Sequence, residues 1–461
     1  MNDEEEIILS TQWIETIKKE MEEYRELMLK AERYLWAHPQ TGFKEWDAHN
    51  YLKEKFVEMG FCLKEAGNIP GFYFDIDSGV AGPTVCLLGE LDSIICFEHP
   101  ECNPETGAVH SCGHHCQVSA LLGIAGVLSK KNILSQLVGK IRIMAVPAEE
   151  LLEISDRVRM AENGVIKYLG GKTEFMSRGY FDDVDITIMV HTLPGEKPYL
   201  HMHQGFNGMI AKKITYKGKA AHAAAQPWNG INALYAAQTG MSAINALRET
   251  FPDQYHVRFH PIITQGGVMV NNIPSETVIE TQLRGADFPA LRGINQRINR
   301  AFGSSALAFG AQLEVSDLEI YMPEKNDNGL NELLYKVGCE LIGKEHVRHD
   351  PDFWDCASTD MGNISAVMPA AHPFISGAGG RPHGDNYYIS NPDLAVVQPA
   401  LLLSGVACEL LGNDAVRAKE IIENYEPLFD SIPEFLSAFD EICVTRELVS
   451  YTDETEATVR W

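Results

Sequence analysis

Short runs of apolar residues alternate with longer amphipathic stretches through the first part of the chain. Apolar residues spaced three or four apart predict a helix over residues 11–37, which ends before the His38-Pro39 step because proline disfavours helix in the preceding residue. A second helix is expected over 46–59 and another after residue 112. Apolar runs predict strands at 71–77, 84–91, 140–146 and 185–191. This alternation is typical of an α/β fold with a largely parallel sheet sandwiched by helices.

The pattern changes at about Gly205. The expected elements are then a strand at 211–218, a helix at 230–248, strands at 255–264 and 277–285, a helix at 290–302 and a strand at 312–322. That order is the split βαβ arrangement of a ferredoxin-like α+β domain. We therefore expect a main domain formed by residues 1–204 and 323–429, an inserted domain at 205–322 and a C-terminal extension at 430–461. A packed helix and a loose tail both fit the extension.

Composition and charge narrow the functional class. The formal net charge of −26 argues against a nucleic-acid partner, which needs a basic face. The longest nearly apolar run, 120–128, is too short to span a bilayer, and the acidic N-terminus lacks the features of a signal peptide. Ten cysteines in 461 residues are too few for a disulfide scaffold. A cytoplasmic protein without a membrane partner is expected.

The most informative motif is Cys112-Gly113-His114, directly before an apolar stretch that predicts a helix. A thiolate and an imidazole two positions apart are typical metal ligands. Cysteines also occur at 96, 102 and 116, with further histidines at 110 and 115. A structural zinc knuckle is therefore an alternative, although the usual paired spacing of its ligands is absent.

Other ionisable residues follow the ends of predicted strands. Glu90 and Asp92 end one strand, Glu149 and Glu150 follow the next, and His191 ends a third. Adjacent glutamates are usually solvated and a histidine often belongs to the core, so each has an ordinary structural reading by itself. However, burying a charged carboxylate next to so apolar a strand costs free energy, unless the carboxylate is paired or binds a metal. Because ligands of open α/β sheets bind beyond the carboxyl ends of the strands, these residues predict one site.

Taken together, the motifs resemble a known family along nearly the whole chain to about residue 425. The matching segments are HPQTGFKEW, LGELDSI, HSCGHHCQ, VPAEE, FDDVDITIMVHTLPG, GKAAHAA, GGVMVNNIPSETVIETQLRG, STDMGNISAVMP and the region of His383. They are similar to the dinuclear metallopeptidases and amidohydrolases that include hippurate hydrolase, auxin-conjugate hydrolases, carboxypeptidase G and carnosine dipeptidases. The branch with the p-aminobenzoyl-glutamate hydrolase catalytic chain and β-alanyl-lysine-type dipeptidases is the most similar.

The resemblance implies a zinc-exopeptidase-like catalytic domain that holds two divalent ions, zinc or manganese. Cys112 would bridge the ions, with Glu150 and His383 completing one site and His114 and His191 the other. The implied substrate is an N-acyl amino acid or an unusual dipeptide, whose amide bond is attacked by a bridging hydroxide. Two cations make a shared water acidic enough for this role.

The resemblance also implies roles beyond the ligand set. Glu149 matches the general base. Asp92 would contact a metal ligand without binding the metal itself. His222 would steady the oxyanion, while Asn272 and Arg284 would contact substrate. Each of these residues also has an ordinary structural explanation. His222 could be a surface histidine, Asn272 could belong to a turn, and Arg284 could form an ion pair within the sheet. The inserted domain is implied to act as a lid and to form a homodimer.

Two departures from the family pattern concern specificity. His115 stands where relatives have Asp or Asn, and LLEISDRVRM at 151–160 replaces a glycine-rich continuation after Glu150. A catalytically silent binding or scaffold protein is the alternative function. The complete set of implied ligands argues against it, since a silent protein has no need for them.

Overall fold

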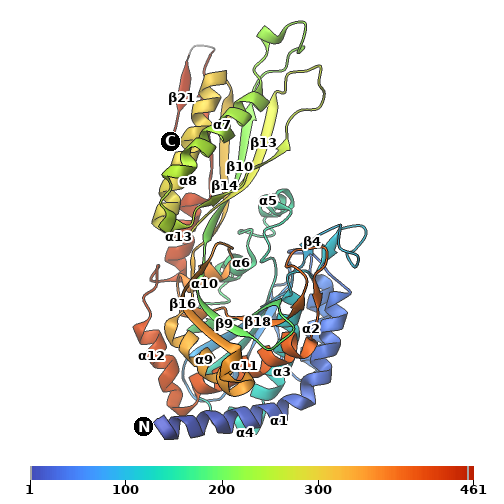
Figure 1. Ribbon diagram of the computed structural model, residues 1–461, viewed down its shortest axis with the longest axis vertical. Helices are drawn as coiled ribbons and strands as arrows, with labels where there is room; N and C mark the ends of the chain where they lie inside the picture. The colour runs from blue at the N-terminus through green and yellow to red at the C-terminus, as the bar shows by residue number, and fades with distance from the viewer. Residues whose placement is uncertain (1–2, 454–455) are drawn as a thin grey trace. The chain divides into compact units, whose positions relative to one another are not determined.

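The computed structural model describes residues 3–453 and 456–461, which form two compact units. The first unit comprises Met1–Gly205, Lys325–Phe353 and Asn363–Ile432, and the second comprises Phe206–Glu324, Trp354–Gly362 and Pro433–Trp461. Figure 1 labels some of the elements of each unit. Each unit has its own β-structure and its own helices.

A mixed sheet with a parallel centre forms the middle of the first unit. Its strands are β1 (Lys64–Glu65), β2 (Phe72–Asp77), β6 (Lys140–Val146), β3 (Thr84–Glu90), β7 (Ile186–Ile188) and β17 (Ala370–Ala371), in that spatial order. β6, β3, β7 and β17 are mutually parallel neighbours, whereas β2 runs antiparallel to β6. All seven residues of β3 are buried, as expected for a central strand covered on both faces.

Helices cover this sheet and supply most of its core. The long elements are α1 (Asp3–Trp36), α2 (Trp46–Glu58), α3 (His114–Leu128), α9 (Asn328–Ile342) and α11 (Gln398–Leu411). Every residue of α3 is buried, because it packs against α1, α11 and β3. The stretch Asp393–Leu411 is apolar and long enough to cross a membrane, but 89% of its most apolar window is buried in the protein. This burial is that of a helix in the core of the first unit.

Shorter elements complete the first unit. They are β4 (Ile94–Ile95), β5 (Ala108–Val109), α4 (Lys131–Leu134), α5 (Ile154–Glu162), α6 (Gly171–Ser177) and α12 (Val416–Asn424). A further sheet has the order β15 (Glu324–Lys325), β9 (Leu200–Phe206), β18 (Phe374–Gly379) and β19 (Tyr388–Ile389), with β16 (Val347–Asp355) beside β9 and β8 (His191–Pro194) beside β18. α10 (Met361–Ser365) lies where the chain passes between the units.

An antiparallel sheet with helices forms the second unit. Its strands are β11 (Arg258–Phe259), β13 (Glu276–Gly285), β10 (Gly208–Lys217), β14 (Gln312–Tyr321), β20 (Thr445–Tyr451) and β21 (Ala457–Val459), with β12 (Ile262–Gln265) also beside β13. The helices are α7 (Ala233–Leu247), α8 (Phe288–Phe309) and α13 (Ile432–Ile442). Asp287 caps α8 by accepting a hydrogen bond from the amide of Ala290, and Gly310 ends it in a left-handed conformation.

The α/β fold class and the split βαβ order are confirmed. Several element boundaries differ: α1 begins at Asp3 and α8 extends to Phe309, and two of the expected strands are interrupted. The expected strand 185–191 is interrupted, since β7 stops at Ile188 and β8 begins at His191 in a different sheet. The expected strand 255–264 is two short strands, β11 and β12, on either side of Pro261. Proline cannot donate a backbone hydrogen bond to a sheet. A packed helix and a loose tail were both open for the C-terminal residues. In the structure these residues are packed, and β20 pairs with β14.

Candidate metal centre

The parallel strands of the first unit bring the predicted residues to one edge of the sheet. β6 and β7 flank β3, so their carboxyl ends lie side by side. Glu90 ends β3, Glu149 and Glu150 follow β6, and His191 follows β7. This is the edge at which open α/β sheets bind ligands.

A tight turn places Cys112 and His114 beside these strand ends. Gly113 adopts a φ of 95° at the start of α3, a conformation that non-glycine residues rarely adopt. A Cβ atom at this position would lie 2.6 Å from the Tyr387 hydroxyl oxygen. Glycine is therefore required, and the turn points the thiol and the imidazole into the same site.

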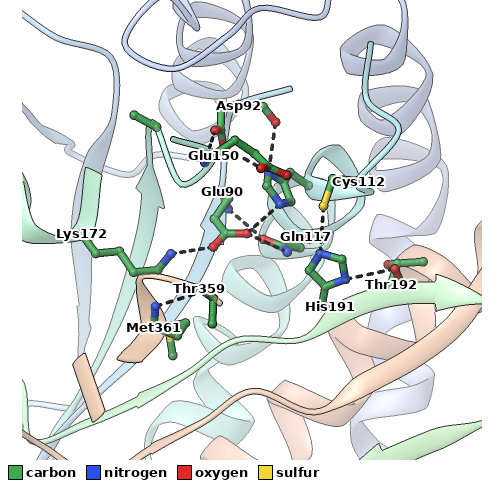
Figure 2. A network of polar contacts seen from close by, with 12 residues as sticks. Glu90, Asp92, Cys112, Gln117, Glu150, Lys172, His191, Thr192, Thr359 and Met361 are labelled. Atoms are coloured by element: carbon green, nitrogen blue, oxygen red, sulfur yellow. Dashed lines mark hydrogen bonds and ion pairs between the residues drawn. The ribbon is translucent and has the colours of Figure 1, made fainter. Parts of the chain in front are cut away.

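The possible ligating atoms form four groups among the described residues. Two of these contain Glu149, with His114 and Glu150 in one and with Glu90 and Asp360 in the other, and the remaining two share Cys112. One group is Cys112, His114 and His191, and the other is Cys112, Glu150 and His383; within each, all ligating atoms lie within 4.8 Å of one another. The Cys112 Sγ lies 3.3 Å from the His191 Nε2, and the His383 Nε2 lies 2.9 Å from the Glu150 Oε1. Figure 2 shows Cys112 pointing toward His191 at this site. The shared thiol is what a pair of neighbouring ions would require.

Hydrogen bonds on the far side of two rings fix which nitrogen faces the site. The His191 Nδ1 lies 3.1 Å from the carbonyl oxygen of Thr192 and donates to it, so Nε2 is the nitrogen that faces Cys112. The His114 Nδ1 contacts both the carbonyl oxygen and the Oδ1 of Asp92 at 3.1 Å. The Asp92 Oδ2 also accepts a hydrogen bond from the amide of Glu150. Asp92 thus orients two of the candidate ligands at once.

The charges of the site fit a divalent cation. Burial opposes ionisation of Cys112, but the imidazoles of His114 and His191 lower the pKa of its thiol to about 5. Hydrogen bonds with Cys112 and Glu150 raise the pKa of the His383 imidazole to about 11. Burial again opposes ionisation of Glu150, whose pKa is lowered to about 2 by His383. A thiolate and a carboxylate therefore lie among three imidazoles, a donor set that suits Zn²⁺ and is open to Mn²⁺.

A buried ion pair between Lys172 and Glu90 lies next to these candidate ligands. The Lys172 Nζ lies 2.6 Å from the Glu90 Oε1, and both side chains are at most 1% exposed. The Glu90 Oε2 accepts a hydrogen bond from Gln117 (Figure 2). The same oxygen lies 3.2 Å from the His114 Nε2. Burial opposes the charge, but Lys172 and His114 hold the pKa of Glu90 below its ordinary range. Sequence reasoning missed Lys172 and Gln117, because neither belongs to the strand-end pattern.

Lys172→Met is expected to lower the free energy of unfolding by about 3–5 kcal/mol, because Glu90 keeps its buried charge but loses the ammonium group that pairs with it. The double variant Glu90→Gln/Lys172→Met removes both charges and should cost less than Lys172→Met alone. Urea denaturation of the wild type, both single variants and the double variant measures this coupling. A double variant less stable than Lys172→Met would show that charge compensation is not the reason for the pair.

The remaining predicted site residues, His222, Asn272 and Arg284, belong to the second unit. His222 and Asn272 form an antiparallel bridge, which places them side by side. The His222 Nδ1 accepts hydrogen bonds from the amides of Ala224 and Ala225, so the neutral ring carries its proton on Nε2. Arg284 lies on β13 and donates to the Gln282 side chain at 2.6 Å, a contact within the sheet.

The cysteine cluster does not form a second set of ligands. Among residues 3–453 and 456–461, the groups able to hold a metal include Cys112 but not Cys96, Cys102 or Cys116. Cys96 and Cys102 instead pack against the small apolar cluster around Ile94. The structure gives the zinc-knuckle alternative no support.

His115, the departure next to His114, is fully buried and directed away from the candidate ligands. Its Nε2 lies 3.4 Å from the Glu32 Oε1, and its ring lies 5.3 Å from that of Trp36, both on α1. His115 therefore joins α3 to α1, and no candidate ligand group among the described residues contains it. His372 is buried, and its ring lies 5.8 Å from that of His191.

Comparison with known proteins agrees with this geometry. The model of peptidase family M20/M25/M40 matches residues 86–402, which include all five candidate ligands and Glu149. The chain is 28% identical to the Xaa-Arg dipeptidase of Mus musculus over 375 residues, covering 77% of this chain and 78% of that one. It is 26% identical to a p-aminobenzoyl-glutamate hydrolase chain of Escherichia coli over 327 residues, covering 66% and 61%.

Solved structures show the same fold. A dinuclear metal-binding peptidase of the M20 family from Bacillus subtilis matches with a TM-score of 0.62 and 17% identity, over 85% of this chain and 99% of that one. An aminobenzoyl-glutamate utilization protein from Klebsiella pneumoniae matches with a TM-score of 0.63 and 17% identity, over 85% and 98%. The family match spans more than half of the chain, and the curated relatives are named dipeptidases and hydrolases. The chain therefore belongs to peptidase family M20/M25/M40 and is a metal-dependent hydrolase of amide bonds.

Proposed function

We propose that this enzyme holds two divalent ions, zinc or manganese, and cleaves the amide bond of a dipeptide or an N-acyl amino acid. The observation that carries the proposal is the sharing of Cys112 between two groups of ligating atoms. His114 and His191 complete the group for one ion, and Glu150 and His383 complete the group for the other. When bound, the two cations activate the attacking water and polarise the substrate carbonyl.

Glu149 is the proposed general base. It is 8% exposed and follows β6 directly before the proposed ligand Glu150. It lies near His114 and Glu150 in one group of possible ligating atoms, but it is absent from both groups that contain the proposed bridge Cys112. A carboxylate that is not used as a ligand can accept a proton from the attacking water. The same carboxylate then returns that proton to the leaving amine nitrogen. Asp92 keeps His114 and Glu150 in place for this step.

Residues of the second unit are proposed to recognise the substrate. The Nε2–H of His222 is a donor suited to the oxyanion that forms when water adds to the carbonyl. The adjacent Asn272 would contact the substrate amide, and Arg284 would bind its carboxylate in exchange for the hydrogen bond to Gln282.

A substrate panel tests the proposed function. The panel contains a dipeptide with C-terminal arginine, p-aminobenzoyl-glutamate and indole-3-acetyl-aspartate, which follow the names of relatives. The purified protein is assayed after chelation and again after addition of Zn²⁺ or Mn²⁺. Hydrolysis that is lost on chelation and restored by metal supports the proposal. Metal binding without hydrolysis of any member would favour a binding or scaffold protein instead.

Metal binding is expected to release protons at pH 7. Against the effect of burial, contacts with Cys112 raise the pKa of His114, and they also raise the pKa of His383, so each ring must lose a proton before it can bind metal. The apparent affinity for Zn²⁺ should therefore rise from about pH 6 to about pH 9 and fall as the solution is acidified. Calorimetric titration in buffers of different ionisation enthalpy measures the release. Heats that do not depend on the buffer would contradict protonated rings.

We propose that the enzyme is a cytoplasmic homodimer that associates through the second unit. Large apolar side chains are exposed there: Trp228 is 76% exposed, Val268 93% and Val270 95%. Apolar surface of this kind is typical of an interface. All ten cysteines are free thiols, which suits a reducing compartment. Light scattering of the wild type and a Val268→Asp/Val270→Asp variant tests the association, and a monomeric wild type would refute it.

A further inference from the structure

The turn that carries Glu149 and Glu150 contains an unusual backbone conformation. Ala148 has a φ of 58°, in the left-handed region, where a residue with a Cβ atom is strained by about 1–2 kcal/mol. Such a conformation persists only where surrounding contacts determine it. The direction in which both glutamates leave β6 therefore depends on the contacts that hold Ala148.

Two contacts hold Ala148 through its own peptide groups. Its amide donates a hydrogen bond of 2.8 Å to the Glu45 Oε1, and its carbonyl oxygen accepts one of 3.1 Å from the amide of Gly171. A Cβ atom on Gly171 would lie 1.6 Å from the carbonyl oxygen of Pro147, so only glycine allows this approach. These contacts fix the residue before Glu149. The carbonyl oxygen of Glu150 accepts a hydrogen bond of 2.8 Å from the amide of Leu152 and has a side-chain partner as well.

That side-chain partner is Arg157 on α5. Its side chain is 2% exposed, and its guanidinium donates hydrogen bonds to the backbone carbonyls of Ala148, Glu150 and Leu169. A guanidinium has five N–H donors in a rigid fork and can bind several carbonyls at once, which an ammonium on a flexible stem does less well. One side chain thus spans both ends of the Glu149-Glu150 turn.

The space for this guanidinium is provided by the loop between α1 and α2. A Cβ atom on Gly42 would lie 2.2 Å from the Arg157 Nη2, and the ring of Phe43 lies 5.5 Å from the guanidinium carbon. Glu153, at the start of α5, accepts hydrogen bonds from Thr41 and Lys44 of the same loop. The loop therefore holds α5 and leaves room for Arg157.

We propose that Arg157 is a positioning residue for the reaction, which fixes the general base Glu149 and the ligand Glu150 by binding the carbonyls on either side of them. This inference rests on the proposed function of those two glutamates. It also gives the segment 151–160 a role, because this segment supplies a buried cation that contacts the turn.

The expected consequence is a combined loss of metal affinity and turnover. Groups that orient a ligand typically change metal affinity by about 10–100-fold when they are removed. A misplacement of about 1 Å in a catalytic group can lower the rate by about 100-fold. Arg157→Lys should therefore weaken binding of one of the two ions by about 10-fold or more and lower kcat by about 100-fold, while KM changes little because the substrate contacts remain.

The test compares Arg157→Lys and Arg157→Ala with Arg159→Met, a control on the same helix whose side chain is 70% exposed. Metal dissociation constants are measured by calorimetry. The kinetic constants kcat and KM are measured with the best substrate of the panel, and thermal unfolding is followed by circular dichroism. We expect Arg159→Met to match the wild type. Added guanidinium chloride, at concentrations that do not unfold the protein, should restore metal affinity and kcat to Arg157→Ala and leave the wild type, with Arg157 intact, unchanged.

Two outcomes would overturn the inference. One is an Arg157→Lys variant with the metal affinity and kcat of the wild type. The other is a loss of thermal stability in both Arg157 variants with no change in metal affinity or kcat below the unfolding temperature, which would make Arg157 purely structural. A wild-type protein that binds no metal and cleaves no substrate would instead contradict the proposed function.

Discussion

Glu149→Gln is expected to lower kcat by about 10²- to 10⁴-fold, the range that general acid–base catalysis supplies. Glutamine is nearly isosteric but cannot accept the proton of the attacking water. KM should change little, because Glu149 has no proposed contact with the parts of the substrate that do not react. Steady-state kinetics on the best substrate of the panel measures the effect.

The metal content of the same variant separates catalysis from binding. Glu149 is not a member of either Cys112 group, so Glu149→Gln should retain two ions per chain. Glu150→Gln is the matched comparison, because the neighbouring carboxylate is a proposed ligand and its loss should lower metal occupancy. A Glu149→Gln enzyme with full activity would rule out the proposed base.

Cys112→Ala is expected to remove both ions, since its sulfur belongs to both groups of ligating atoms. We expect the affinity to fall by more than about 100-fold, the upper end of the effect of groups that only support a ligand. Activity should be lost in parallel. Elemental analysis after dialysis against a defined concentration of free Zn²⁺ measures the occupancy.

Cys96→Ala is the control for Cys112→Ala. Cys96 is partly buried in the same region but packs against the apolar cluster around Ile94. Its removal should leave two ions and full activity. If Cys96→Ala and Cys112→Ala lost the same amount of zinc, the cysteines would form a structural zinc site, and the shared-thiolate arrangement would be wrong.

The strand pattern explains why the ligand region could be predicted from the sequence. Glu90, Glu150 and His191 each come at or just after the end of an apolar run, and parallel strands bring the residues at their carboxyl ends to one edge of the sheet. His383 is different. It adopts a φ of 58° in a turn between β18 and β19, and only the family resemblance pointed to it.

The supporting residues could not be predicted, because their partners are distant in sequence. Lys172 contacts Glu90 across 82 positions, and Glu45 contacts Ala148 across 103. The periodic spacing of hydrophobic residues predicts helices and strands, but it does not predict contacts between side chains so far apart in the sequence. His115 shows the converse: it adjoins a ligand in sequence, yet helical geometry turns its ring toward Glu32 on α1. A neighbour of a ligand in sequence is therefore a weak guide to specificity.

The interrupted strand before His191 has a similar cause. The pattern of 185–191 is that of one buried strand, but β7 ends at Ile188 and the chain changes sheets before His191. β8 then pairs with β18, in which Phe374 stands opposite His191. The break allows the His191 ring to face Cys112 while its Nδ1 bonds to the carbonyl of Thr192.

Cobalt substitution tests the central claim, that one thiolate serves two ions, most directly. The metal-free protein is titrated with Co²⁺ while absorbance is recorded, because a cobalt–thiolate bond gives a charge-transfer band that oxygen and nitrogen ligands do not. The wild type and Cys96→Ala should each bind two Co²⁺, with a band that continues to change up to the second equivalent, and Cys112→Ala should show no band. A band that persists in Cys112→Ala, or that is complete at one equivalent in the wild type, would contradict a thiolate shared by two ions.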